Sequence, residues 1–388
     1  MPEPVKPIYL DHNASTPLLP EVLQAMLPYL ADHHGNPSSP HLYGRILRQA
    51  IDRAREQVAS LIDCSPGEIL FTSGGTEANN LAIRGTALAN PGRRRIITSV
   101  VEHPATSAPC AYLEEQGYRI DRAPVDNMGA VDLQFMHQAI STDALLVTVM
   151  HANSETGTLQ PIGAIADIAQ ACGALLHTDA AQSLGKVEVS VRRENVDLLS
   201  IAGHKLYAPH GVGALFIKAG TTIKPLLLGA GHENGLRPGT ENVASIVGLG
   251  QACAAARRDL SRESQRVERL RDRLWEQLKN RVPGIALNGH PVSRLPNTLN
   301  VRFPGVSGND LLAACPSIAA STGSACHAAG ASASAVILAM GIPGDEAIGS
   351  VRLSLGRENN EGAIEQAATE LAGAWQSLKK GSHGERAI

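Results

Sequence analysis

Leu198-Leu199-Ser200-Ile201-Ala202-Gly203-His204-Lys205-Leu206 is the stretch of sequence that decides the fold. It predicts a short apolar strand that runs into a turn ending on a single lysine. Apolar runs upstream also stop at polar residues where a strand would end, at 68–71, 95–100, 144–150 and 175–179. An open parallel sheet gathers such ends at one edge, where ligands bind in α/β folds.

Lys205 lies at the end of this strand, and a lysine in a ligand crevice suggests that its amine forms a covalent bond with the ligand. We interpret Lys205 as the residue that forms a Schiff base with a carbonyl cofactor. Taken alone, the lysine is also compatible with a side chain that extends from a strand end to solvent. The polar residues at the ends of the other predicted strands favour the covalent role.

The composition is that of an ordinary globular protein with a sizeable core, with 388 residues, 43% hydrophobic and 18% charged. A formal net charge of -3 gives no signal for nucleic acid or membrane partners. No long apolar run or signal peptide is evident, so a cytoplasmic location is expected. The six cysteines are scattered without a C-x-x-C pair, which predicts neither disulfides nor a metal site.

Residues 72–80, Thr-Ser-Gly-Gly-Thr-Glu-Ala-Asn-Asn, follow a predicted strand and open a helix. This arrangement presents backbone N–H groups and the positive helix end to an anion. Gly75 and Thr76 are therefore candidates for phosphate binding. An ordinary strand-to-helix turn capped by threonine is the alternative.

Polar residues also follow the other predicted strands: His103, Asn153, Asp179 and Gln182. A histidine such as His103 can lie against an aromatic cofactor and transfer protons, or can simply form hydrogen bonds in the core. Because strands alternate with helices, the sequence predicts βαβ units and an α/β fold with a mostly parallel sheet.

The composition changes near residue 256, where a charge-rich helical run over 258–281 begins. We expect a large cofactor-binding domain over 15–256 and a smaller α+β domain made of 1–14 and 257–388. The smaller domain contains a loop of small residues, about 321–334, which is expected to be mobile. Cys326 lies in this loop beside His327, which favours a reactive thiolate, although an unremarkable surface cysteine is the alternative.

Assembled, these residues match the contributions that proteins make to pyridoxal-phosphate chemistry. Asp179 would pair with the protonated ring nitrogen, His103 would stack on the ring, and Lys205 would form the Schiff base. Thr76 and His204 would hold the phosphate.

The hydroxyl oxygen of the ring would be bonded by Asn153 or Gln182. Several further motifs accompany this set and extend over nearly the whole chain. With them, the chain resembles cysteine desulfurases of the IscS/NifS type, in the class V aminotransferase group of fold-type I pyridoxal-phosphate enzymes. The motifs are Tyr9-Leu10-Asp11, Gly35-Asn36-Pro37-Ser38-Ser39, residues 72–77, Glu102-His103, residues 178–182, Gly203-His204-Lys205, Arg237-Pro238-Gly239-Thr240, Ser324-Ala325-Cys326 and residues 352–357.

The resemblance implies a large domain with a mostly parallel seven-stranded sheet flanked by helices, and a cysteine desulfurase activity. L-Cysteine would displace Lys205 from the cofactor, with its carboxylate held by Arg352 and Asn153. The thiolate of Cys326 would attack the substrate sulfur, leaving a persulfide on Cys326 and releasing L-alanine. His103 would act as acid and base together with Lys205.

The resemblance also implies a homodimer in which Thr240 reaches the phosphate of the neighbouring subunit's cofactor. The persulfide sulfur would pass to an acceptor protein such as an iron–sulfur scaffold, which implies a role in iron–sulfur cluster assembly. The chain departs from the family pattern at Ser154, where a second asparagine is usual, and at Ala202, where a phosphate-binding serine is frequent. Ser200 is out of register with that serine.

Other functions remain open at this point. Cys326-His327 resembles the Cys-His pair of selenocysteine lyases, which share the fold and cofactor. Another class V enzyme, such as an aminotransferase, would have no need of Cys326. A non-catalytic sulfur-carrier or metal-binding protein is the alternative from a different class.

Overall fold

The computed structural model describes residues 6–323 and 333–384. At its centre lies a seven-stranded sheet with strand order β2-β8-β7-β6-β5-β3-β4. These strands are β2 (Ile69–Thr72), β8 (Gly213–Ile217), β7 (Leu198–Ala202), β6 (Leu175–Asp179), β5 (Ala144–Thr148), β3 (Arg95–Ser99) and β4 (Arg119–Ala123).

Most neighbouring strands of this sheet are parallel, which confirms the predicted fold class. Strand β8 alone runs antiparallel, to both β2 and β7, so that these two strands point in the same direction. The central strands are buried along their whole length, as expected for strands covered on both faces. The edge strand β4, which includes Arg119 and Arg122, is only partly buried and has no continuous apolar run in the sequence.

Helices cover both faces of the sheet because successive side chains of each strand point to opposite sides. Phe71 packs on one face with helices on that side, and Leu70 packs on the other. The first face is covered by α1 (Pro20–Ala31), α2 (Leu42–Ile62), α5 (Leu133–Ala139), α6 (Ile162–Ala171) and the first part of α7 (Val243–Arg281). The second face is covered by α3 (Gly75–Ala89) and α4 (Pro104–Glu115).

The C-terminal part has its own antiparallel sheet with order β12-β10-β9 and its own core. The N-terminal strand β1 pairs with β11 of this part, and Leu10 lies in the same core. The elements are β1 (Ile8–Tyr9), β9 (Ala286–Asn288), β10 (Thr298–Arg302), β11 (Ile318–Ala319), β12 (Ser350–Ser354), α8 (Gly308–Ala313), α9 (Ala335–Ala339), α10 (Gly344–Ala347) and α11 (Glu361–Gly384).

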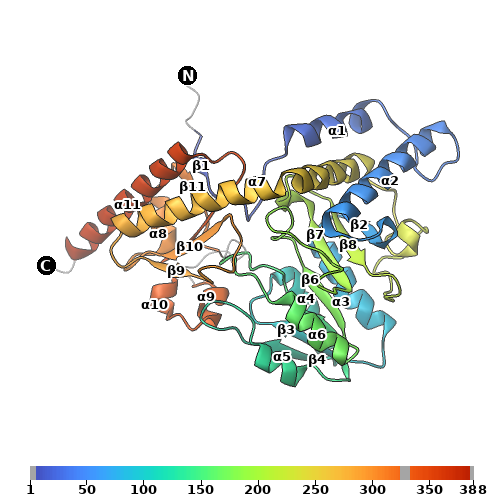
Figure 1. The fold of residues 1–388 in the computed structure, drawn as a ribbon, viewed down its shortest axis with the longest axis horizontal. Coiled ribbons are helices and arrows are strands. Elements are labelled where there is room, and N and C mark those ends of the chain that lie inside the picture. Colours follow the sequence, from blue (N-terminus) through green and yellow to red (C-terminus); the bar gives the residue numbers. More distant parts are fainter. Residues whose placement is uncertain (1–5, 324–332, 385–388) are drawn as a thin grey trace.

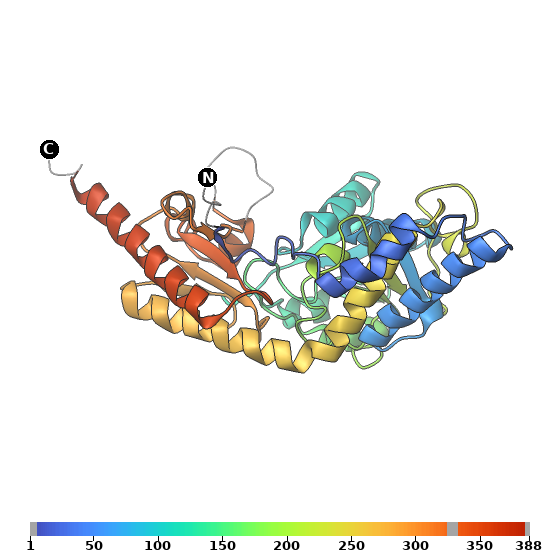
Figure 2. The same cartoon turned by 90° about the horizontal axis from the view of Figure 1, so that it is seen from above.

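Helix α7 connects the two parts as one unbroken helix of 39 residues. Figure 1 shows it running across the molecule from α1 and α2 toward α8 and α11, and Figure 2 shows it along one side of both parts. Ile246 and Leu249 belong to the core of the large sheet, whereas Leu270 and Leu274 belong to the C-terminal core. The predicted change of domain near residue 256 falls inside this helix, and the division into 15–256 and the remainder stays a prediction. No helix in the described part of the chain is long and apolar enough to cross a membrane.

Candidate active site

The candidate active site is a cavity at one edge of the large sheet. The residues that follow the carboxyl ends of β2, β3, β5, β6 and β7 meet there, as expected for this kind of sheet. The cavity is lined by Gly75, Thr76, Asn79, His103, Ala105, Met150, Ala152, Ser154, Asp179, Ala181, Gln182, Ala202, His204 and Lys205.

The turn between β2 and α3 forms one wall of the cavity. Gly74 has a φ of 153°, a backbone conformation that favours glycine, and α3 begins at the next residue, Gly75. A Cβ added to Gly75 would lie 3.1 Å from the Cβ of Ala202, so the turn and the end of β7 are tightly packed. The first N–H groups of a helix have no intrahelical acceptor, so the start of α3 offers an anion site beside Thr76.

Asp179 is the last residue of β6, and its carboxylate is 8% exposed in relative terms. The Asn79 side chain donates to its Oδ2 at 2.7 Å, and the Ala181 backbone N–H donates to its Oδ1 at 2.9 Å. These two donors occupy both carboxylate oxygens and hold the side chain in place. A carboxylate in this place can stabilise a positive charge on a bound ring.

His103 lies at the start of α4, where its Nδ1 accepts a hydrogen bond from the Ala105 backbone N–H at 3.1 Å. This bond leaves the proton of the neutral ring on Nε2. Burial is the main cause that lowers the pKa of His103; nearby Lys205 also lowers the pKa, and Asp179 opposes both. The side chain therefore presents a neutral ring to the cavity.

Lys205 follows β7 in the 3₁₀ turn η2 (Gly203–Lys205), and its Nζ donates to the backbone carbonyl of Asn13 at 2.8 Å. Its neighbour His204 also lines the cavity and stacks on His210 with a distance of 5.4 Å between ring centroids. Burial, reinforced by the nearby charge of Lys205, lowers the pKa of His204 to about 4. A neutral imidazole at this position is available as a hydrogen-bond partner.

Arg352 belongs to β12 of the C-terminal part and lies at an adjoining, larger cavity that His103 and Lys205 also line. Its guanidinium donates to Asp11 Oδ1 at 2.7 Å and to the Ser154 backbone carbonyl at 3.1 Å. A guanidinium is suited to binding a carboxylate. Both parts of the molecule therefore contribute side chains to the site.

Cys326 lies outside the described residues, as does most of the predicted loop. The chain on either side of it, at Gly323 and Ala335, lines the same larger cavity as Arg352. Glu155 lies close to the chain before and after the predicted cysteine loop. Its carboxylate lies so near Gly323 that a Cβ there would clash with it, and its Oε2 accepts a hydrogen bond from Ser334 Oγ at 2.5 Å.

Two of the residues predicted to bind the cofactor do not line its cavity. The side chain of Asn153 is buried and directed into its own turn, where Oδ1 accepts from the backbone N–H groups of Glu155 and Thr156, each at 2.9 Å. Thr240 is exposed on the loop after β8. Their predicted roles stay predictions.

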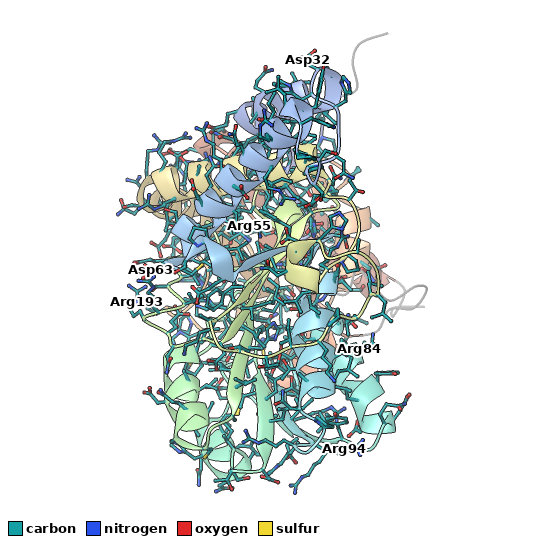
Figure 3. The ribbon with its side chains drawn as sticks, turned by 90° about the vertical axis from the view of Figure 1, so that its right-hand side faces the viewer. Asp32, Arg55, Asp63, Arg84, Arg94 and Arg193 are labelled. Atoms are coloured by element: carbon teal, nitrogen blue, oxygen red, sulfur yellow. The ribbon has the colours of Figure 1, made fainter. Side chains whose placement is uncertain are left out.

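The loop after β8 is held against the outside of the large domain. Arg55 of α2, which is labelled in Figure 3, pairs with Glu233 in this loop at 2.5 Å. Arg237 of the same loop pairs with Glu77 of α3 at 3.0 Å. The loop that contains Thr240 is therefore anchored close to the start of α3.

Ser200 does not take the place of the phosphate-binding serine that is missing at Ala202. Its hydroxyl is fully buried and lies 2.9 Å from Nε2 of His177, on a part of β7 that does not line the cavity. This position agrees with the sequence-based expectation that Ser200 is out of register with the usual phosphate-binding serine.

Sequence reasoning assigned no role to Asn79, Asn13 or Lys186. Asn79 was detectable, since it follows Gly75 by four residues and therefore lies one helical turn later, on the side of α3 that faces the site. Asn13 is 192 residues away from Lys205 in the sequence, and no local pattern connects the two. Lys186, four residues after Gln182, contacts the Gln182 side chain at 3.1 Å.

The residues of the cavity fit pyridoxal phosphate. The helix start at Gly75 suits the phosphate, the amine of Lys205 suits the aldehyde, and Asp179 with its two donors suits the ring nitrogen. His103 also lines the space between them.

Comparison with known proteins agrees with this geometry. The family model described as aminotransferase class-V matches residues 8–366. A cysteine desulfurase of Trichormus azollae is 44% identical over 92% of this chain and 90% of that protein. The cysteine desulfurase NifS of Azotobacter vinelandii is 43% identical over 94% of this chain and 91% of that protein.

A solved structure described as a NifS-like protein superposes with a TM-score of 0.89 at 34% identity, covering 95% of this chain and 98% of that one. These likenesses extend over both parts of the molecule, including β12 and Arg352. The enzymes of this family depend on pyridoxal phosphate. The chain belongs to the class V aminotransferase family, among the cysteine desulfurases of the IscS and NifS type.

Proposed function

We propose that the protein is a pyridoxal-phosphate-dependent cysteine desulfurase that converts L-cysteine to L-alanine and leaves a persulfide on Cys326. The observation that carries this proposal is the convergence of Lys205, Asp179 and the helix start at Gly75 on one cavity, with Arg352 at the adjoining one. The cytoplasmic location predicted from the sequence remains part of the proposal.

Several side chains of the cavity are proposed to bind the cofactor. The start of α3 with Thr76 and His204 would hold the phosphate, Asp179 would keep the ring nitrogen protonated, and Gln182 would donate to the ring hydroxyl oxygen. When bound, pyridoxal phosphate supplies an aldehyde that reacts with amines and a ring that accepts electrons.

Arg352 is proposed to bind the carboxylate of L-cysteine. The predicted help of Asn153 requires its side chain to leave the turn in which it is buried. The hydrogen bond from Arg352 to Asp11 directs the guanidinium while leaving other N–H groups to meet a substrate. His103 carries its proton on Nε2, so it is proposed to exchange protons with the substrate alongside the Lys205 amine.

The sulfur transfer is proposed to begin when the Cys326 thiolate attacks the sulfur of bound cysteine. A sulfur–sulfur bond forms, the carbon–sulfur bond breaks, and its electron pair stays with the carbon fragment. That fragment takes up a proton and leaves as L-alanine. The persulfide sulfur then passes to an acceptor protein, for which an iron–sulfur scaffold is the proposed class.

A homodimer is also part of the proposal, with Thr240 reaching the neighbouring subunit's phosphate site. Large apolar side chains are exposed on α1, at the start of α2 and in the loop after β8, which lie toward the same side of the molecule in Figure 1. Exposed apolar groups of this kind are typical of surfaces that contact another protein. They include Leu30 at 63%, Leu42 at 59%, Tyr43 at 54%, Leu227 at 56% and Leu228 at 91% exposure.

The deciding experiment measures L-alanine and sulfide released from L-cysteine, in the presence of a thiol reductant, by the wild type and by Cys326→Ala. We expect the variant to lose desulfuration while it still binds pyridoxal phosphate. Cys64→Ala, which removes a partly buried thiol elsewhere, is the matched control and should keep wild-type turnover.

Three results would contradict the proposal. Full activity in Cys326→Ala would indicate a class V enzyme with another reaction. A strong preference for L-selenocysteine over L-cysteine would indicate a selenocysteine lyase. A wild-type protein that does not bind pyridoxal phosphate would favour the non-catalytic alternative.

A further inference from the structure

Lys186 is a lysine with no part in the chemistry proposed above, yet it contacts Gln182 at the wall of the cofactor cavity. Together with Lys205 it lines a second cavity on the side of Tyr207 and Arg357. Its Nζ donates to Gln182 Oε1 at 3.1 Å and to Asn13 Oδ1 at 3.5 Å. Gln182 itself lines the cofactor cavity.

Asn13 connects Lys186 and Gln182 with Lys205 through hydrogen bonds. Its backbone carbonyl accepts from Lys205 Nζ at 2.8 Å and from Gln182 Nε2 at 3.0 Å. Its side-chain amide donates to Thr298 Oγ1 at 2.9 Å and to the Ser154 backbone carbonyl at 3.1 Å, so the position of Asn13 is fixed by other elements. Lys186, Gln182, Asn13 and Lys205 therefore form one hydrogen-bonded group.

The orientation of the Gln182 amide follows from the chemistry of its two neighbours. A carbonyl oxygen only accepts, so the Asn13 carbonyl requires the NH₂ end of the amide. An ammonium group only donates, so Lys186 requires the oxygen end. The amide nitrogen has two hydrogens, and since Asn13 takes one, the other can be offered to the cavity.

We propose that Lys186 is a positioning residue that holds the Gln182 amide against the Asn13 carbonyl, so that Gln182 presents a donor to the ring oxygen of the cofactor. Without Lys186, the Gln182 oxygen loses its donor, and the amide is held only by its bond to the Asn13 carbonyl, so its second N–H is presented to the cavity less rigidly. The inference rests on the proposed cofactor site.

The charge state of Lys186 is compatible with this role. Burial, with Lys205 and Arg352 close by, lowers the pKa of Lys186 to about 7. Both the protonated and the neutral amine carry N–H groups that donate to Gln182. A direct effect of the Lys186 charge on Lys205 is the competing explanation, and the experiment must separate the two.

The test is a double-mutant cycle on the affinity of the apoprotein for pyridoxal phosphate, measured by titration. The four proteins are the wild type, Lys186→Met, Gln182→Ala and the variant with both changes. Methionine keeps a long side chain and removes the donor. Lys218→Met is the control, because Lys218 pairs with Asp197 at 3.3 Å and is not a lining residue of the cofactor cavity.

We expect Lys186→Met to weaken cofactor binding about 3- to 10-fold, the effect of one lost hydrogen bond. In the Gln182→Ala background, Lys186→Met should change the affinity for pyridoxal phosphate by less than about twofold, because Lys186 acts through the Gln182 amide. The pH midpoint of the visible absorbance of the bound cofactor should shift in Lys186→Met and not in Lys218→Met.

Equal effects of Lys186→Met in both backgrounds would overturn the inference in favour of a direct charge effect. Unchanged affinity and an unchanged absorbance midpoint in Lys186→Met would overturn it as well. A wild-type protein that does not bind pyridoxal phosphate would instead overturn the proposed function. Circular dichroism of each variant shows whether a loss of binding comes from misfolding.

Discussion

At the scale of single residues, the site depends on buried polar side chains whose partners come from distant parts of the sequence. Asp179 accepts from Asn79, 100 residues away in the sequence, and Lys205 donates to the Asn13 carbonyl, 192 residues away. Behind them, His177 is fully buried between Thr148 and Ser200. Changes to these side chains should alter charge and proton binding more than the fold.

Asp179→Asn should lower turnover of L-cysteine by about 100-fold or more, because a neutral amide cannot stabilise a charge that develops on the ring. Asparagine has nearly the same shape, so the free energy of unfolding should change by less than about 2 kcal/mol. Steady-state turnover and denaturant unfolding measure both effects.

Asp197→Asn is the matched control for Asp179→Asn, because Asp197 lies at the opposite end of the sheet, where it accepts from the Leu176 N–H at 2.9 Å. It should keep wild-type turnover. Wild-type turnover in Asp179→Asn would show that the buried acid has no role in the reaction.

His177 should make the protein less stable as the pH falls from 6.5 to 4. Burial lowers the pKa of His177 to about 4, below its usual value of 6.5, so the unfolded chain binds a proton in this range and the folded chain does not. The stability contributed at pH 7, up to about 3 kcal/mol, is therefore lost on acidification.

Denaturant unfolding at pH 7.5 and pH 5 measures this dependence. In His177→Gln, which keeps hydrogen-bonding groups but does not titrate, the difference in unfolding free energy between the two pH values should be smaller than in the wild type. An identical difference in both proteins would mean that His177 is protonated in the folded state.

At the scale of elements, the ends of β2 and β7 carry the phosphate turn and Lys205, and β8 lies between these two strands. Gly213 of β8 is opposite both Thr72 and Ala202, the last residues of β2 and β7. The spacing of the site therefore depends on a single residue of a strand that contributes no side chain to it.

Gly213→Ala should weaken binding of pyridoxal phosphate about tenfold and destabilise the fold by about 1–3 kcal/mol. A Cβ at this position would lie 2.8 Å from the Gly74 backbone and would clash with the Ile201 carbonyl, so the phosphate turn would have to move. Cofactor titration and denaturant unfolding are the measurements.

Gly163→Ala is the control for this substitution, since a Cβ there has no heavy atom within 4 Å and the residue lies in α6. It should leave cofactor binding unchanged and stabilise the helix by roughly 0.5–1 kcal/mol. Equal cofactor affinity in Gly213→Ala and the wild type would show that the turn tolerates the extra methyl group.

Helix α7 should contribute to stability mainly through its buried leucines. Leu274→Ala, at a fully buried position of the C-terminal core, should cost about 2–5 kcal/mol of unfolding free energy. Leu260→Ala, on the same helix at a partly buried position, should cost clearly less. Similar losses for both would mean that burial does not set the contribution of this helix.

At the scale of the whole molecule, the site is built from two packed parts. The cofactor cavity belongs to the large sheet, whereas Arg352 and the chain before and after the predicted cysteine loop belong to the C-terminal part. The relative placement of the two parts therefore sets the distance between substrate carboxylate and cofactor.

Replacing Leu30 and Leu228 together by glutamate should raise the dissociation constant of the proposed homodimer at least about tenfold, because charges would be buried in an apolar contact. Analytical ultracentrifugation over a range of protein concentrations measures the change. Val292→Glu, at an 82% exposed apolar position in the C-terminal part, is the control and should not alter the dimer. A dimer of unchanged affinity in the double variant would exclude these leucines from the interface.

The sequence by itself determined the elements and the chemical class of the site. Apolar runs predicted β2, β3, β5, β6 and β7, because buried parallel strands require continuous hydrophobic side chains. Since polar residues at the carboxyl ends of such strands must share one edge, Asp179, Lys205, His103 and Gly75 were predicted together and lie in one cavity.

Only the tertiary structure decided which side chains contact one another across long sequence separations. Local periodicity is a property of neighbouring residues, whereas the contacts of Asn13 with Lys205 and of Asp11 with Arg352 depend on how distant segments pack. The same reason explains why Lys186 had no predicted role, because its contact with Asn13 joins residues 173 positions apart. A strand end can be predicted from its own residues, but the partner of a side chain is selected by the packing of the whole chain.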